Sequence, residues 1–192
     1  VFYNDIKGDY ENSWYIPYDK LLSTIEWRNF RKRILERDNY ECLKCNKKQS
    51  EKIGDVYFRT LTASERQAKL EDIIVIDILG DGEFVSKSKP PTVTGVKLEH
   101  PTILHVHHKF YIYGNLPWDY EIDSLLTVCH ECHKEIHKTE RIKVYSDNSL
   151  NQAINLTPCI RCNGTGFLDE YHYFQNGICF RCSGRKFDEF IK

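Results

Sequence analysis

Apolar residues recur at helical spacing near the start of the chain. Thr24 is suited to cap a helix, and four apolar residues would then share one face of it over residues 24–38: Trp27, Phe30, Ile34 and Leu35. The positions between them are polar and mostly basic. The pattern predicts a helix with one buried face and one charged face.

Short apolar runs replace the helical period further along. Three strands are expected, with a turn at Asp81-Gly82, over residues 73–78, 83–85 and 92–98. No cluster of reactive side chains falls in this stretch, so residues 49–100 are interpreted as an insertion. Beyond it, apolar residues and histidines alternate over residues 104–109, which is typical of a strand end.

These patterns divide the chain into an N-terminal arm, a central domain, a linker and a C-terminal unit, over residues 1–26, 27–145, 146–158 and 159–192. The arm is rich in aromatic residues but lacks interleaved basic ones. Packing on the body is therefore preferred over stacking on nucleic-acid bases. The linker is assigned from its polar composition.

The overall composition does not indicate a binding partner. The net charge is −1, so nucleic-acid binding has to rest on local clusters. Such a cluster lies between Trp27 and Lys48, where eight lysines and arginines oppose three acidic residues. No apolar run reaches membrane-spanning length, and the first ten residues do not resemble a secretory signal. We therefore expect a cytoplasmic protein with no membrane association.

The eight cysteines all fall in C-x-x-C pairs. A disulfide framework would fit a secreted protein, and a redox motif would need one pair rather than four. Pairing the four knuckles two by two instead gives two tetrahedral four-cysteine sites for structural Zn²⁺. The first site would comprise Cys42, Cys45, Cys129 and Cys132. The second would comprise Cys159, Cys162, Cys179 and Cys182.

Histidines gather around the second C-x-x-C pair, Cys129 and Cys132. If a helix follows that knuckle, His133 and His137 are one turn apart on a single face, where a metal ion can bind both. His107 and His108 lie at the end of the expected strand before it. We interpret the group as a metal site, and we place His105 and His130 outside it as surface or supporting residues.

The order C-x-x-C, V-H-H, then C-x-x-C-H-x-x-x-H resembles the HNH nucleases over roughly residues 27–138. The resemblance implies a small α+β fold: a ββα-metal (HNH) core stapled by a four-cysteine zinc site, with a β-rich insertion and a C-terminal zinc-ribbon-like unit. It implies that His107, His133 and His137 hold a catalytic ion and that His108 is the general base. The family's middle asparagine corresponds to Ser124, which cannot bridge two groups as an amide does.

The activity implied by this resemblance is metal-dependent hydrolysis of DNA, with duplex DNA as the expected partner and products carrying 5′-phosphate and 3′-hydroxyl ends. One catalytic divalent ion is expected, and three imidazoles suit Zn, Ni, Co or Mn better than Mg. A neutral histidine is a suitable base near neutral pH. Candidate phosphate contacts are Arg28, Arg31, Arg33 and Lys109.

The C-terminal unit contains C-x-x-C-x-G-x-G, similar to half of the cysteine-rich region of DnaJ-type chaperones. A chaperone function does not follow from so short an element, and docking to DNA or to a partner protein are equally open. Two alternatives to a DNA endonuclease also stay open. One is a non-catalytic zinc module that binds nucleic acid or protein, and the other is a nuclease that cleaves RNA.

Overall fold

The helix predicted after Thr24 is confirmed as α3 (Ile25–Arg37) in the computed structural model, which describes residues 1–67, 95–171 and 177–191. Thr24 Oγ1 accepts a hydrogen bond from Trp27 N at 3.3 Å, as expected of a cap. All four apolar residues predicted to face inward are buried. The amphipathic pattern therefore fixes both the start of α3 and its inner face.

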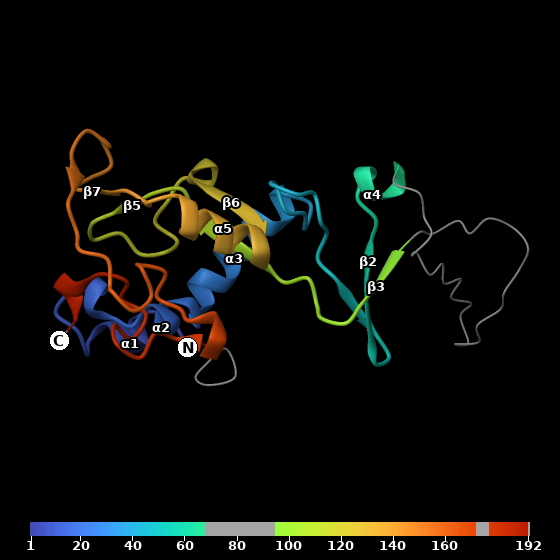
Figure 1. Ribbon diagram of the computed structural model, residues 1–192. Helices are drawn as coiled ribbons and strands as arrows, with labels where there is room; N and C mark the ends of the chain where they lie inside the picture. The colour runs from blue at the N-terminus through green and yellow to red at the C-terminus, as the bar shows by residue number, and fades with distance from the viewer. Residues whose placement is uncertain (68–94, 172–176, 192) are drawn as a thin grey trace, which may run out of the picture.

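A strand pair and a helix form the centre of the fold (Figure 1). β4 (Leu104–His108) pairs antiparallel with β6 (Leu125–Cys129), and α5 (His130–Thr139) follows β6 directly. Because side chains alternate along a strand, His107 contacts α5 while His108 stacks on Trp27 of α3. The two histidines of the doublet therefore point to opposite faces of β4.

The C-terminal end of α3 is fastened to β6 by a charged clamp. Arg37 makes a two-pronged ion pair with Asp38 and also donates to the carbonyl of Leu125 at 2.9 Å. Asp38 in turn accepts from Thr127 N at 3.0 Å. These bonds place the chain that leaves α3, which carries Cys42, beside the end of β6.

The insertion forms a separate small sheet that projects from the body (Figure 1). Its antiparallel strands are β1 (Glu51–Ile53), β2 (Val56–Thr60) and β3 (Gly95–Leu98), with α4 (Ala63–Gln67) after β2. The strands expected over residues 73–78 and 83–85 lie outside the described residues. Ser50 and Thr102, at the two ends of the insertion, bond to each other through Thr102 N to Ser50 Oγ at 2.9 Å and Ser50 N to Thr102 O at 3.3 Å.

The polar segment predicted to be a linker contributes to a third sheet. β7 (Val144–Tyr145) pairs in parallel with β5 (Tyr111–Ile112) and antiparallel with β8 (Ala153–Ile154), which lies within residues 146–158. A two-residue strand carries no periodic signal of its own. The 3-10 helix η2 (Ile122–Ser124) leads into β6.

The N-terminal arm packs on the body, as predicted. It contains α1 (Asn4–Lys7), η1 (Ser13–Tyr15) and α2 (Tyr18–Leu22), and the C-terminal unit contains η3 (Asp169–Tyr171) and η5 (Asp188–Phe190). Trp14 of the arm stacks on Phe187 of the C-terminal unit, with ring centroids 6.2 Å apart. The arm and the C-terminal unit thus lie side by side beneath the central domain (Figure 1). Within the described residues, no helix combines the length and the apolar character needed to cross a membrane.

Candidate metal centre

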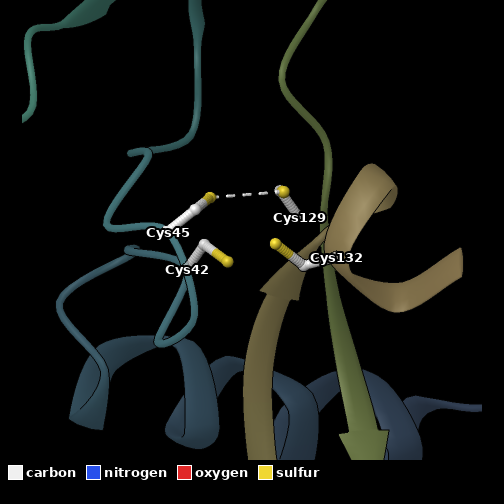
Figure 2. A group of neighbouring side chains, drawn as sticks. All are labelled: Cys42, Cys45, Cys129 and Cys132. Atoms are coloured by element: carbon white, nitrogen blue, oxygen red, sulfur yellow. Dashed lines mark hydrogen bonds between the residues drawn. The ribbon is translucent and has the colours of Figure 1, made fainter. Parts of the chain in front are cut away.

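The first four-cysteine cluster joins α3 to the β6–α5 junction. Cys42 and Cys45 lie in the loop after α3, Cys129 ends β6, and Cys132 lies in the first turn of α5. Figure 2 shows the four sulfur atoms pointing toward a common centre. Their ligand atoms all lie within 4.8 Å of one another, as predicted from the knuckle spacing.

The second cluster lies within the C-terminal unit and groups the other four cysteines, again as predicted: Cys159, Cys162, Cys179 and Cys182. Gly166 has a φ of 81°, and a Cβ there would approach the Gly184 carbonyl oxygen to 2.9 Å. This close approach requires glycine. In this conformation, Gly166 N donates a hydrogen bond to Cys162 Sγ at 3.3 Å.

Both clusters have the donor set and the spacing of a structural zinc site. The Sγ atoms of Cys45 and Cys129 are 3.6 Å apart, and those of Cys162 and Cys182 are 3.7 Å apart. A zinc–sulfur distance of about 2.3 Å in a tetrahedron places sulfurs about 3.8 Å apart. All eight cysteines are free of disulfide bonds. The clusters are therefore compatible with two structural zinc ions.

A third group is made of imidazoles. His107 comes from β4, and His133 and His137 come from successive turns of α5. The Nε2 atoms of His133 and His137 are 3.3 Å apart, and the ring centroid of His107 lies 5.2 Å and 5.1 Å from those of His133 and His137. Their ligand atoms lie within 4.8 Å of one another, so the three rings could hold a metal ion.

Burial keeps these rings neutral. It lowers the pKa of His107 to about 3, of His133 to about 2 and of His137 to about 4, and the neighbouring positive charges act in the same direction. A neutral imidazole has a lone pair to give to a cation. His107 Nδ1 is also buried without a hydrogen-bond partner, which leaves an orphaned polar atom that a bound cation could satisfy.

These pKa shifts predict a dependence of stability on pH. Unfolded histidines take up protons below about pH 6.5, whereas the folded cluster stays neutral down to about pH 4. The unfolded state then binds more protons, so the free energy of unfolding should fall between pH 7 and pH 5. Each histidine contributes up to about 1.4 kcal/mol per pH unit. The free energy of unfolding at each pH is measured by urea denaturation. The protein used has zinc in its two cysteine clusters, and the buffer contains no further divalent cation.

A matched variant isolates the contribution of the cluster. His137→Gln removes one of the buried imidazoles, so its free energy of unfolding should change less steeply with pH than that of the wild type. Equal stability of the wild type at pH 5 and pH 7 would contradict the neutral cluster.

His108, the predicted base, lies outside this group of ligands. Its ring is only 2% exposed and is enclosed by Trp27, Tyr111 and Tyr120. Nε2 lies 2.9 Å from the carbonyl oxygen of Pro117. Because a carbonyl oxygen only accepts, Nε2 carries the proton in neutral His108, and the lone pair is on Nδ1. Burial lowers the pKa of this ring to about 3.

Ser124 supports the strand end through its main chain. Its carbonyl oxygen accepts from Lys109 N at 3.0 Å, directly after the histidine doublet. Within the loop between β5 and η2, the Asn115 amide donates to the Asp119 carbonyl at 2.8 Å. Ser124 therefore supports the strand end through its carbonyl oxygen, and Asn115 braces the loop that precedes it.

The four candidate phosphate contacts differ in their surroundings. Arg28 and Arg33 are exposed on α3. Arg31 donates to the Leu104 carbonyl at 2.7 Å and so ties α3 to β4. Lys109 Nζ donates to the Asp123 carbonyl at 2.7 Å. Arg28 Nε also donates to the Thr24 carbonyl at 3.4 Å, so three of the four cations already make hydrogen bonds to main-chain carbonyls.

Two residues near the site have no counterpart in the sequence prediction. Pro117 fixes the tautomer of His108 through its carbonyl oxygen, and Lys186 reaches the same region from the C-terminal unit. Pro117 stands in no recognisable motif, whereas Lys186 takes the position in the second C-x-x-C-x-G element that Gly166 has in the first. The roles of both residues depend on contacts between distant segments. The chain matches no protein-family model, no curated protein and no solved structure.

Proposed function

We propose that the chain is a metal-dependent endonuclease of the HNH type that hydrolyses phosphodiester bonds in DNA. One observation carries the proposal. Two antiparallel strands and the helix that follows them, β4, β6 and α5, bring His107, His133 and His137 together. The four-cysteine cluster fastens the start of that helix. This is the strand–strand–helix order expected of a ββα-metal core.

The three imidazoles would hold one divalent cation, for which nitrogen ligands favour Zn, Ni, Co or Mn. When bound, the cation supplies a positive charge that stabilises the phosphate oxygens as negative charge develops on them. The protein contributes rigidity, because His133 follows Cys132 directly in α5. A structural zinc at Cys132 therefore limits the movement of the ligand beside it.

His108 is proposed to take the proton from the attacking water through Nδ1. The other proton stays on Nε2, which donates it in a hydrogen bond to the Pro117 carbonyl oxygen, and this bond stabilises the protonated ring as it forms. Trp27, Tyr111 and Tyr120 cover the ring in the structure. The loop that carries Pro117 and Tyr120 therefore has to move before a phosphate can reach Nδ1.

DNA would approach along the exposed basic side of α3. Arg28 and Arg33 offer guanidinium groups to phosphate oxygens there. Arg31 and Lys109 donate hydrogen bonds to main-chain carbonyl oxygens. They would contribute positive charge, but they would contact a phosphate only if these hydrogen bonds were released.

The enclosure of His108 favours a second candidate, a non-catalytic zinc module in which the histidine cluster holds a third structural ion. A base with 2% of its surface exposed cannot reach a substrate without a conformational change. A nicking assay separates the two candidates, because only the nuclease requires His108 to exchange a proton.

His108→Gln is the most informative variant for that assay. Glutamine keeps an N–H donor for the Pro117 carbonyl but is not a base at neutral pH. With Mn²⁺ or Ni²⁺, we expect supercoiled plasmid to be nicked about 10²- to 10⁴-fold more slowly than by the wild type. Metal content should be unchanged.

The matched control is His100→Gln, which alters an exposed histidine outside the cluster and should cleave like the wild type. Single-stranded RNA tested beside the plasmid identifies the preferred nucleic acid. Wild-type protein that binds three ions and cleaves neither substrate would support the non-catalytic module.

A further inference from the structure

A cavity of about 50 Å³ lies where the N-terminal arm, the loop after β4 and the C-terminal unit meet. Aromatic side chains form much of its wall, including Trp14, Tyr18, Tyr111 and Tyr120. Polar side chains also line it, namely Ser13, His108, Asn115, Arg185 and Lys186. The metal-ligating histidines do not, so the cavity lies on the side of His108 away from the histidine cluster.

Lys186 is the buried cation of this cavity, and the half-buried Arg185 beside it is bonded to the Tyr15 carbonyl. Its side chain is buried, with the residue 6% exposed, and Nζ lies 3.7 Å from the ring centroid of Tyr18 and 4.0 Å from that of Tyr111. Nζ also donates a hydrogen bond to the Tyr111 hydroxyl. These contacts hold the ammonium group in one place.

No carboxylate balances this charge. Within the part of the chain that the structure describes, none of the ion pairs includes Lys186. Burial lowers the pKa of Lys186 to about 7, and the sulfurs of Cys162 and Cys182 in the second cluster, whose charge would be shared with a bound zinc ion, act in the opposite direction. A buried ammonium is unfavourable unless it is paired. On the cavity side, the ammonium meets the rings of Tyr18 and Tyr111 and the Tyr111 hydroxyl, but no anionic side chain among the described residues.

Lys186 has a backbone conformation that is energetically unfavourable for a lysine. Its φ is 74°, in the left-handed region that favours glycine. The Lys186 carbonyl accepts from Cys159 N at 2.8 Å, and Arg185 Nε donates to the Tyr15 carbonyl at 2.8 Å. The second cysteine cluster and the arm thus fix a strained residue whose side chain points among the tyrosines.

We infer that this cavity is a binding site for a phosphate-type oxyanion, which the Lys186 ammonium would pair with beside His108. A cavity of this volume has room for a few waters or one small oxyanion. The choice of phosphate over other oxyanions rests on the proposed nuclease function. The C-terminal unit would then supply a phosphate contact, Lys186, on the far side of His108 from the histidine cluster, rather than serving only as a separate docking module.

Titration calorimetry with inorganic phosphate on the full zinc-loaded chain tests the inference. Lys186→Met preserves the aliphatic stem and removes the charge, so phosphate should bind at least about tenfold more weakly. Lys20→Met is the matched control, since Lys20 Nζ also bonds to a tyrosine hydroxyl, that of Tyr10, but on the surface. It should bind phosphate like the wild type.

A second measurement covers the case in which Lys186→Met does not fold. In wild-type protein, the Lys186 ammonium resonance should shift in a ¹H–¹⁵N spectrum as phosphate is added, and Lys186→Arg should bind phosphate while lacking that resonance. A resonance that does not move, or a Met variant that binds phosphate as tightly as the wild type, would overturn the inference.

Two further arms identify the source of the phosphate and separate this inference from the proposed function. The first arm compares the binding of inorganic phosphate, of a nucleoside 5′-monophosphate and of DNA duplexes with and without a 5′-phosphate. This comparison distinguishes a free ion, the 5′-phosphate of a product end and an internal phosphate. Phosphate should still bind to His133→Ala, which has lost a proposed ligand of the catalytic ion. Loss of binding there would assign the phosphate to the metal and refute the cavity. Retained cleavage there would instead refute the proposed metal site.

Discussion

His133→Ala is expected to reduce the metal content from three divalent ions per chain to two and to lower DNA cleavage by at least about 10³-fold. His133 contacts both other rings of the cluster, with centroids 5.2 Å from His107 and 4.7 Å from His137. Its loss leaves two imidazoles, too few to hold the cation in a fixed position. Elemental analysis of dialysed protein and a plasmid-nicking rate measure the two effects.

His130→Ala provides the control on the same helix. His130 is exposed at the start of α5 and lies outside the three-histidine group. This variant should keep three ions and most of the cleavage rate. Wild-type protein that binds only two ions under saturating Mn²⁺ or Ni²⁺ would contradict the proposed third site.

Cys129→Ser should unfold the central domain rather than slow its chemistry. The Cys129 side chain is fully buried where β6 meets α5, and its sulfur lies 3.6 Å from that of Cys45. Structural zinc contributes on the order of 10–16 kcal/mol of binding free energy, comparable with the roughly 5–15 kcal/mol that separates folded from unfolded domains. Circular dichroism should show loss of helix, and the chain should release at least one zinc ion.

Leu43→Ser changes the same knuckle without touching a ligand. Leu43 is 53% exposed between Cys42 and Cys45, so the polar substitution should leave the helix content and the zinc content unchanged. A folded Cys129→Ser protein with its full zinc content would show that the first cluster does not require all four sulfurs.

Local spacing was sufficient to predict the parts of the candidate site that lie close together in sequence. The cap at Thr24 and the buried face of α3 follow from helical periodicity. The one-turn separation of His133 and His137 follows from the helix that begins after Cys129. The grouping of the cysteines follows from knuckle spacing and the number of ligands that zinc takes.

Contacts between distant segments were not predictable in this way. Arg31 looked like a free phosphate contact, but it donates to Leu104, 73 residues away in the chain. The enclosure of His108 depends on Trp27 and on the loop that carries Pro117. The insertion of Lys186 among tyrosines of the arm and of β5 likewise depends on tertiary packing, for which a single sequence offers no pattern.

The bonds between Ser50 and Thr102 bear on how this chain tolerates variation in length. They hold together the two points at which the chain leaves the central domain for the β1–β2–β3 sheet and comes back from it. The excursion between them can therefore be shortened, exchanged or removed by joining two neighbouring backbone positions, with little disturbance to β4, β6 and α5. A segment joined in this way can vary in length and sequence while the strand pair and helix that group the three histidines keep their arrangement.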